Sequence, residues 1–300
     1  VAAGRAGAIS HSMGNRHLLA GCSVLCAALG LTLAPAAAGA TPLVARYEAT
    51  AGGMTIMQFD ATFDLEGPSY AIRIQSRMRG VAAWLASGEQ VTSVEGRWEG
   101  NHPIPDRYRQ EGTFRGKRRV VAIDYAPAGM PQLRALEPPN DGEREPVPAA
   151  LRQDTMDGLS ALAKLVRSVS RTGRCDTTAQ VFDGRRRSNY SVRTVSQDVM
   201  PASAGYAGPA LRCAFESRIL AGFRLDQDRE AEAKIPHPAT AWLGHPWPGA
   251  GPVPVLIEMP TRWFGPVRAT LVSIASAGSG QAVAQGGAPE AGPRPGQQGR

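Results

Sequence analysis

The chain has 300 residues, of which 43% are hydrophobic and 20% charged, and its formal net charge is +7. This apolar content is sufficient for a buried core, which excludes a chain that is disordered throughout. The positive excess is modest. Any contact with an anionic partner therefore depends on local clusters of basic residues and not on the total charge.

The first 40 residues have the pattern of a secretory signal. Arg16 and His17 precede an uncharged apolar run over residues 18–33, and residues 38–40 are small. A basic start, an apolar centre and a small-residue cleavage site are typical of a cleavable signal peptide. We therefore expect a mature chain that begins near Thr41 and is exported to the periplasm.

Three alternatives for this N-terminal segment stay open. Met13 is a second candidate start, which would make residues 1–12 an upstream extension. The apolar run could remain as a membrane anchor, although glycines and polar residues interrupt it and a spanning helix needs about 20 apolar residues. Cys22 ends a segment similar to a lipoprotein processing box, in which that cysteine would be acylated.

Beyond residue 43 the hydrophobic pattern has a period of two. Residues 57–65 and 70–78 place apolar side chains on one face, and Glu66–Pro68 separates the two runs, which predicts a β-hairpin. Inward positions include Met57, Phe59, Ile72 and Ile74. Further strands are predicted over residues 43–50, 91–98, 108–114 and 118–125. The first half of the chain is therefore expected to be an antiparallel meander.

A proline-rich segment and one helix follow. Six prolines in residues 127–148 predict a loop. Apolar residues then recur at helical spacing, which predicts a helix over about residues 155–170, with Asp154 or Thr155 as its N-cap and Gly173 beyond its end. Such an amphipathic helix is expected to pack its apolar face on a sheet, with a membrane or partner contact as the alternative.

Sequence typical of strands resumes after this helix. Asp183-Gly184 lies between residues 177–182 and 185–195 and predicts a tight hairpin. Further strands are predicted over residues 211–222, 253–259 and 267–273. Residues 278–300 contain mostly Gly, Ala, Pro and Gln, and we expect them to be a disordered tail. Residues 41–277 then form a single mainly-β domain.

Beyond residue 40 the cysteines are Cys175 and Cys213. In an exported protein such a pair predicts one disulfide. A redox-active or metal-binding pair is the alternative, but there is no CxxC motif and no histidine at ligand spacing. We therefore expect the pair to be structural.

No motif for catalysis is present. The histidines beyond residue 40 are His102, His237 and His245, and each adjoins a proline. They do not form an HExxH motif, and there is no GxSxG motif or pairing of carboxylates that would single out a general acid and base. We therefore expect no catalytic residue, no metal and no cofactor, and interpret the protein as non-enzymatic.

Two tryptophans and two basic clusters are the candidate binding residues. Trp242 and Trp247 flank a loop that could form the lip of an apolar cavity, and packing of these tryptophans in the core or at an interface is the favoured alternative. The basic clusters are Arg115, Lys117, Arg118 and Arg119, and Arg185, Arg186 and Arg187. Either cluster could contact anionic lipid headgroups at a membrane surface, or be a solvated turn between strands. Nucleic acid is not an expected partner in the periplasm.

Several short motifs occur in a set order along the chain. They are Asp157–Leu162 on the predicted helix, Cys175, Val181–Arg186, Cys213, Pro254-Val255 and Phe264-Gly265. In this combination the chain resembles the bacterial exported-protein family catalogued as domain of unknown function 3108, over about residues 43–275. The resemblance implies an antiparallel β protein of the cell envelope and no activity. The proline-rich insert and the loop from Trp242 to Pro254 depart from the family pattern.

The expected fold is mainly β, with a curved antiparallel sheet or open β-barrel wrapped around one α-helix, similar to the folds of periplasmic lipoprotein carriers. We expect a non-catalytic envelope protein that binds a lipid, acyl or lipidated-protein ligand. The expected ligand-binding residues are Met57, Phe59, Ile72, Ile74, Trp242 and Trp247. The alternative is a structural or protein-interaction module with a filled core, which docks an envelope partner through a strand edge or the proline-rich loop.

Overall fold

The computed structural model describes residues 41–85, 87–126, 129–140, 142–202, 205–261 and 265–278. The expected signal segment lies outside these residues. The expected tail also lies outside them, apart from Gly278. The signal segment and the tail therefore stay predictions, and the fold described below is that of the residues between these two segments.

Thirteen strands of this part form one antiparallel sheet. The strands of the first half are β1 (Leu43–Ala51), β2 (Met54–Asp64), β3 (Ser69–Met78), β4 (Gly88–Glu99), β5 (His102–Phe114), β6 (Lys117–Tyr125) and β7 (Pro131–Glu137). The strands of the second half are β8 (Thr177–Phe182), β9 (Arg187–Met200), β10 (Gly208–Ala221), β11 (His237–Gly244), β12 (Val253–Met259) and β13 (Val267–Ser276). The helices are α1 (Gly80–Leu85), α2 (Ala149–Arg152), α3 (Gly158–Thr172) and α4 (Arg229–Lys234).

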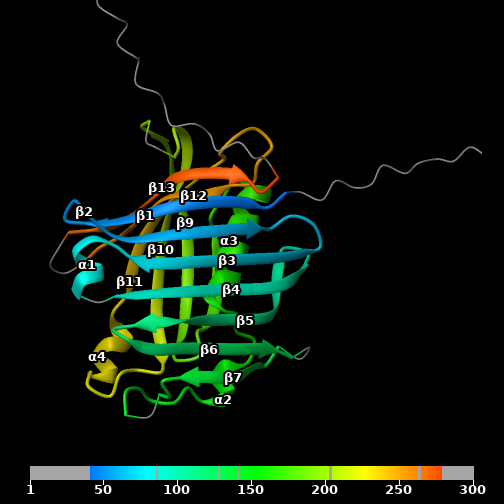
Figure 1. The fold of residues 1–300 in the computed structure, drawn as a ribbon. Coiled ribbons are helices and arrows are strands. Elements are labelled where there is room, and N and C mark those ends of the chain that lie inside the picture. The colour runs from blue at the N-terminus through cyan, green and yellow to red at the C-terminus, as the bar shows by residue number, and fades with distance from the viewer. Residues whose placement is uncertain are drawn as a thin grey trace, which may run out of the picture. The chain divides into compact units, whose positions relative to one another are not determined.

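The sheet is an open barrel with a seam between β7 and β8. Strands that follow each other along the chain are neighbours within each half, and β1 pairs with β13 to join the halves, which leaves β7 and β8 as the two edges. Figure 1 shows β3 to β7 running across the view and β9 to β11 running down it, with α3 between these two parts. The expected curved antiparallel sheet around one helix is confirmed.

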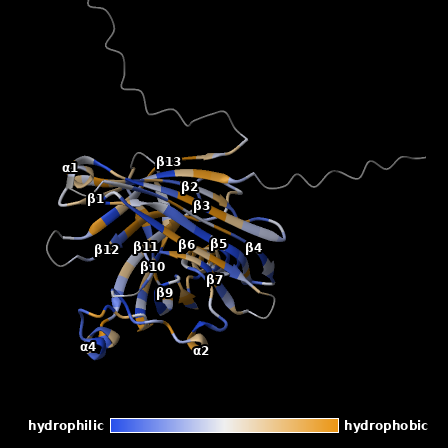
Figure 2. Cartoon of the chain, turned by 60° about the horizontal axis from the view of Figure 1, so that its bottom comes forward, coloured by the Kyte–Doolittle hydropathy of each residue, from blue (hydrophilic) through white to orange (hydrophobic). Residues whose placement is uncertain are grey.

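Period-two patterning explains the concave core. On β3, Tyr70 and Ile72 are buried, whereas Arg73, the next residue after Ile72, is exposed on the opposite face. The same alternation of hydrophobic and hydrophilic residues is visible along the strands in Figure 2, where α4 is hydrophilic. The apolar face of α3 closes the concave side, and its Ala163 is buried against this core. No helix within the described ranges is long and apolar enough to cross a bilayer.

Helix α3 is the predicted helix, but its N-cap is different. Asp157 is extended and accepts hydrogen bonds from the backbone N–H groups of Leu159 and Ser160, so neither Asp154 nor Thr155 caps the helix. The predicted end is confirmed. Gly173 has a φ of 67°, and its N–H donates to the carbonyl of Val169, a conformation that glycine adopts without steric cost.

Two strands lie where loops were expected. Strand β7 crosses the proline-rich segment, because Pro131 lies at the first position of an edge strand, where a missing N–H is tolerated. Strand β11 was not predicted, and it pairs with both β10 and β12 despite its weak strand propensity. Pairing with two neighbours outweighs local preference in a central strand.

The predicted hairpin around Asp183-Gly184 is present with a longer turn. The Asp183 carboxylate accepts hydrogen bonds from the backbone N–H groups of Arg185 and Arg186, and the Asp183 N–H donates to the Arg186 carbonyl. Strand β9 therefore begins at Arg187 and not at Arg185. This turn reaches across the seam to β6. Gly184 lies so close to Val121 of β6 that a Cβ added to the glycine would be 2.6 Å from the valine side chain.

Candidate functional site

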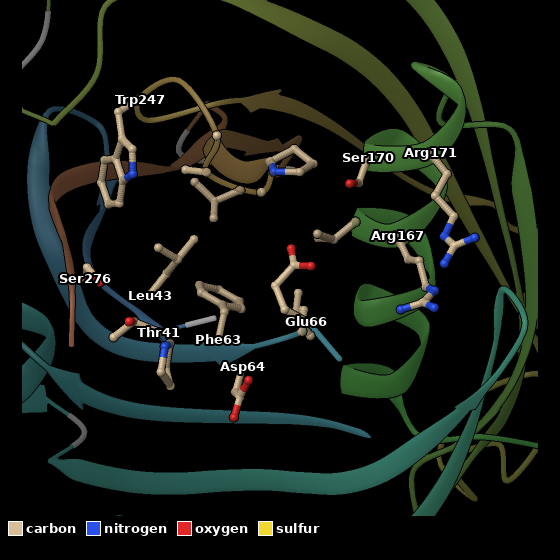
Figure 3. Close-up of a pocket in the computed structure, with 18 residues that line it drawn as sticks. Thr41, Leu43, Phe63, Asp64, Glu66, Arg167, Ser170, Arg171, Trp247 and Ser276 are labelled. Atoms are coloured by element: carbon tan, nitrogen blue, oxygen red, sulfur yellow. The ribbon is translucent and has the colours of Figure 1, made fainter. Parts of the chain in front are cut away.

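Helix α3 packs against the concave face of the sheet, and a cavity lies near either end of β2. The first cavity, here called the Trp247 cavity, has a volume of about 460 Å³. The second half of α3, the start of β1, the end of β2 and the β11–β12 loop surround it. Its apolar lining residues are Leu43, Phe63, Leu65, Val166, Trp247 and Val253. Figure 3 shows Trp247 across the cavity from Leu43 and Phe63.

Charged groups of both signs line one side of the Trp247 cavity. Glu66 extends into the cavity, and Arg167 and Arg171 project from α3 (Figure 3). The guanidinium of Arg167 lies 4.1 Å from the ring centroid of Trp98. Burial lowers the pKa of Arg167, the neighbouring Arg171 lowers it further, and Glu66 raises it. The cavity thus combines apolar walls with a polar side that is balanced in charge.

The second cavity, here called the arginine cavity, has a volume of about 440 Å³. It adjoins the start of β2, whereas the Trp247 cavity adjoins its end; Met57 and Phe63 are roughly 20 Å apart along that strand. Its apolar lining residues are Met57, Met78, Phe114 and Val121, and its arginines are Arg77, Arg119, Arg185 and Arg186. The structure therefore brings the predicted Met57 together with members of both basic clusters.

The two basic clusters differ in their surroundings. Arg115 and Lys117 are exposed at the β5–β6 turn, and Arg118 forms an ion pair with Glu137. The guanidinium groups of Arg115 and Arg119 lie over the ring of Phe114, at 5.4 Å and 5.7 Å from its centroid. This first cluster lies at the surface, as predicted.

In the second cluster the side chains are used within the fold. Arg187 is 5% exposed, and contrary to the prediction it belongs to no surface patch. Arg185 donates to the side chain of Asn140 and to the carbonyls of Glu137 and Pro138, which ties the β8–β9 turn to the end of β7. Burial and the nearby charge of Arg119 lower the pKa of Arg185. Arg186 pairs with Asp183.

Most of the predicted ligand-binding residues belong to the packed core. Ile72 is fully buried, and Phe59 and Ile74 pack against the same core. The Trp242 indole N–H donates to the Asp198 carboxylate, and Arg212 lies over its ring. Met57 and Trp247 do line cavities, one in each.

Several cavity residues were not singled out from the sequence. Phe63 and Leu65 were assigned to an inward face, which is the signal that could have found them. Glu66 and Arg167 carried no such signal, because a turn residue and a polar helix position are normally solvated. They line the cavity because α3 lies beside the β2–β3 turn in the folded protein.

A buried polar cluster fixes α3 inside the sheet. Asp157 is fully buried, and its Oδ2 accepts a 2.6 Å hydrogen bond from the Ser160 hydroxyl, which in turn shares a 2.8 Å bond with the Tyr70 hydroxyl. Because Ser160 donates its one proton to Asp157, Tyr70 is the donor in the second bond. Burial raises the pKa of Asp157, and hydrogen bonds from Ser160 and Leu159 lower it. These groups line neither cavity, so we assign them to the helix cap.

The predicted disulfide is confirmed. Cys175 and Cys213 are bonded, with 5.9 Å between their Cα atoms. The bond joins the segment before β8 to β10, on the seam side of the sheet. Within the described ranges, no three His, Cys, Asp or Glu side chains are grouped so that they could hold a metal ion.

The open sheet and its two cavities define a β-barrel-like protein. A solved structure with this architecture is similar: the β-barrel-like protein of domain of unknown function DUF1849 from Brucella abortus, at 13% identity and a TM-score of 0.50, covering 80% of this chain and 99% of that one. The present chain belongs to the family described as "Protein of unknown function (DUF3108)", which it matches over residues 46–272. No curated protein matches the sequence.

Proposed function

We propose that this protein binds a lipid or acyl ligand in the Trp247 cavity, without catalysis, as an exported protein of the periplasm. The observation that carries the proposal is a preformed cavity of about 460 Å³ with apolar walls and a charged side. Cavities of roughly 300 to 1,000 Å³ with few polar groups are typical of small-molecule sites. Each methylene group of an acyl chain buried there would contribute about 0.8 kcal/mol.

The wall that carries Trp247 is held in place by its own hydrogen bonds. His245 Nδ1 lies 2.8 Å from the carbonyl oxygen of Ala250, and the Ala250 N–H donates to the Trp247 carbonyl at 3.1 Å. Opposite this loop, β1, β2 and α3 supply the remaining walls. A ligand would therefore enter a formed site and would not have to order a loop, which favours affinity.

The disulfide supports the proposed compartment. Disulfides persist in oxidising environments such as the bacterial periplasm, and Cys175 and Cys213 are bonded. The signal-like pattern of residues 1–40 points to the same compartment. Fractionation of cells that express the full-length chain tests this part of the proposal, and recovery in the cytoplasm would contradict it.

Extraction tests the ligand directly. The protein would be produced from the full-length chain, purified without detergent, extracted with organic solvent, and the extract analysed by mass spectrometry. We expect an acyl compound in near-stoichiometric amount. An empty extract from folded, disulfide-bonded protein would contradict the proposal and favour a protein-interaction module.

Neighbouring residues of β1 offer a matched pair of variants. Leu43 lines the cavity, whereas the side chain of Val44 is 42% exposed on the other face of the strand. Leu43→Glu is expected to reduce the bound acyl compound at least about tenfold, because a carboxylate in an apolar wall must be desolvated by the ligand. Val44→Glu should keep it. Thermal melting of both variants checks the fold, and equal ligand content in the two would exclude this cavity as the site.

A further inference from the structure

At the arginine-cavity end, α1 forms an apolar tip on the protein surface. The segment links β3 to β4, and the Arg79 N–H donates to the Ile56 carbonyl, which holds α1 beside the start of β2. Trp84 is 86% exposed, and Val81 and Met54 are each 56% exposed. Tryptophan is highly buried on average, so an indole with almost no intramolecular packing indicates an external apolar contact.

Unpaired cations surround this apolar tip. The guanidinium of Arg79 donates only to the side-chain oxygen of Gln58, a neutral group. The Arg115 N–H donates to the Ser87 carbonyl at 2.9 Å, which brings the β5–β6 turn beside the segment that follows α1. Among the described residues no carboxylate forms an ion pair with Arg79, Arg115 or Lys117. The edge therefore presents apolar side chains next to cations that form no ion pair.

This combination is complementary to an anionic lipid surface. Tryptophan prefers the interface between headgroups and acyl chains, and each Lys or Arg near an anionic leaflet adds to the attraction. A protein partner with an apolar surface would leave the cations unpaired at its rim. The arginine cavity adjoins the same edge, because Met78 and Gly88, which flank α1 in the chain, both line it.

We propose that this edge, formed by α1, the β1–β2 turn and the β5–β6 turn, docks on a membrane surface that contains anionic phospholipid. Trp84, Val81 and Met54 insert at the interface, and Arg79, Arg115 and Lys117 contact the headgroups. The docking edge is at the opposite end of β2 from the Trp247 cavity, so it does not depend on a ligand in that cavity.

Vesicle co-sedimentation tests the proposal on protein produced from the full-length chain and isolated from the soluble fraction. We expect binding to vesicles of phosphatidylcholine mixed with phosphatidylglycerol and little binding to phosphatidylcholine alone. Raising the salt from about 0.1 M to about 1 M should weaken binding, since it shortens the Debye length from about 10 Å to about 3 Å. Absence of binding to the anionic vesicles, or equal binding to both kinds, would overturn the proposal.

Variants locate the contact. Trp84→Ala should weaken binding about tenfold, and Arg115→Ser and Lys117→Ser about fivefold each, whereas Trp84→Phe should retain most of the affinity. The control is Val199→Ala, because Val199 is 81% exposed but lies far along β9 from the arginine cavity. If Trp84→Ala binds as the unmodified protein does, α1 is not the docking element. Leu43→Glu should bind vesicles normally, which separates this test from that of the Trp247 cavity.

Discussion

The two arginine clusters are similar as sequence and different as structure. Around Arg115 the side chains point to solvent, and the cluster borders an exposed apolar tip. In the other cluster Arg187 is buried, Arg185 is partly buried and Arg186 is exposed, and Arg185 and Arg187 donate to backbone and side-chain oxygens of other segments. Both clusters follow strands in predicted hairpins. Local composition therefore indicates a turn. Whether its charged side chains bind other parts of the fold or face solvent depends on what packs against that turn.

The contrast follows from the topology of the sheet. The β5–β6 turn lies at an outer end of two central strands, so nothing covers it. The β8–β9 turn lies at the edge of the sheet and reaches β6 and β7, where Arg185 donates to the carbonyls of Glu137 and Pro138, whereas Arg187 donates to the carbonyl of Leu151 in α2. An open barrel leaves backbone groups without a strand partner at its edges, where such donors can bind them. Three experiments test this difference between the clusters.

The largest effect is expected for Arg187→Ala. The guanidinium donates to the carbonyls of Leu151 and Ser188 and to the side chains of Asn189 and Gln180. Its removal leaves the buried Ser188 carbonyl and three partly buried acceptors without this donor, and we expect the free energy of unfolding to fall by about 2 to 4 kcal/mol. Urea denaturation measures this change. Arg186→Ala is the matched control, since that exposed residue forms only a local ion pair, and it should cost below about 1 kcal/mol.

The second experiment concerns a buried acidic residue, Asp157, in place of a buried arginine. Burial raises the pKa of Asp157 in the folded protein, so the stability that this residue contributes is complete below about pH 4 and is lost as pH rises through the folded-state pKa. Asp157→Asn removes this dependence. Its amide group can donate to the Ser160 hydroxyl, which then donates to Tyr70.

The measurement is the difference in unfolding free energy between the unmodified protein and Asp157→Asn at several pH values. This difference should fall as pH rises from 4 to 8. Other carboxylates titrate alike in both proteins and cancel in the comparison. A difference that stays constant or grows with pH would mean that the carboxylate is stabilised, and not penalised, at this position.

The smallest effect on stability is expected in the exposed cluster. Arg115→Ser combined with Lys117→Ser should change the free energy of unfolding by less than about 0.5 kcal/mol, because neither side chain forms an ion pair among the described residues. Urea denaturation again gives the value. A loss of more than about 1 kcal/mol would show that this cluster is also part of the fold, and the contrast between the two clusters would fail.

The fold was largely predictable from periodicity. Strand β12 has its predicted bounds, and α3 ends at the predicted Gly173. The failures have a common physical cause. Strand β11 and the N-cap Asp157 depend on partners distant in the chain, namely two neighbouring strands and a buried hydroxyl from β3. Patterns within a short window do not contain that information.

The candidate sites were less predictable than the fold. Trp247 was a candidate cavity residue and lines a cavity, but Ile72 and Trp242 pack in the core, because α3 covers the middle of the concave face. No local pattern around Trp84 indicates that its side chain is exposed. Its exposure becomes evident when α1 is placed beside the start of β2.

The class of fold, the pairing of Cys175 with Cys213 and the membership of the family can be predicted from the amino-acid sequence, because alternation, cysteine number and motif order are properties of the chain alone. Tertiary structure decided where the seam lies, which arginines are buried and where cavities remain. These features arise when strands and helices far apart in the chain compete for the same volume. In the packed structure each side chain contacts a partner, borders a cavity or faces solvent, and no local sequence pattern specifies which of these it does.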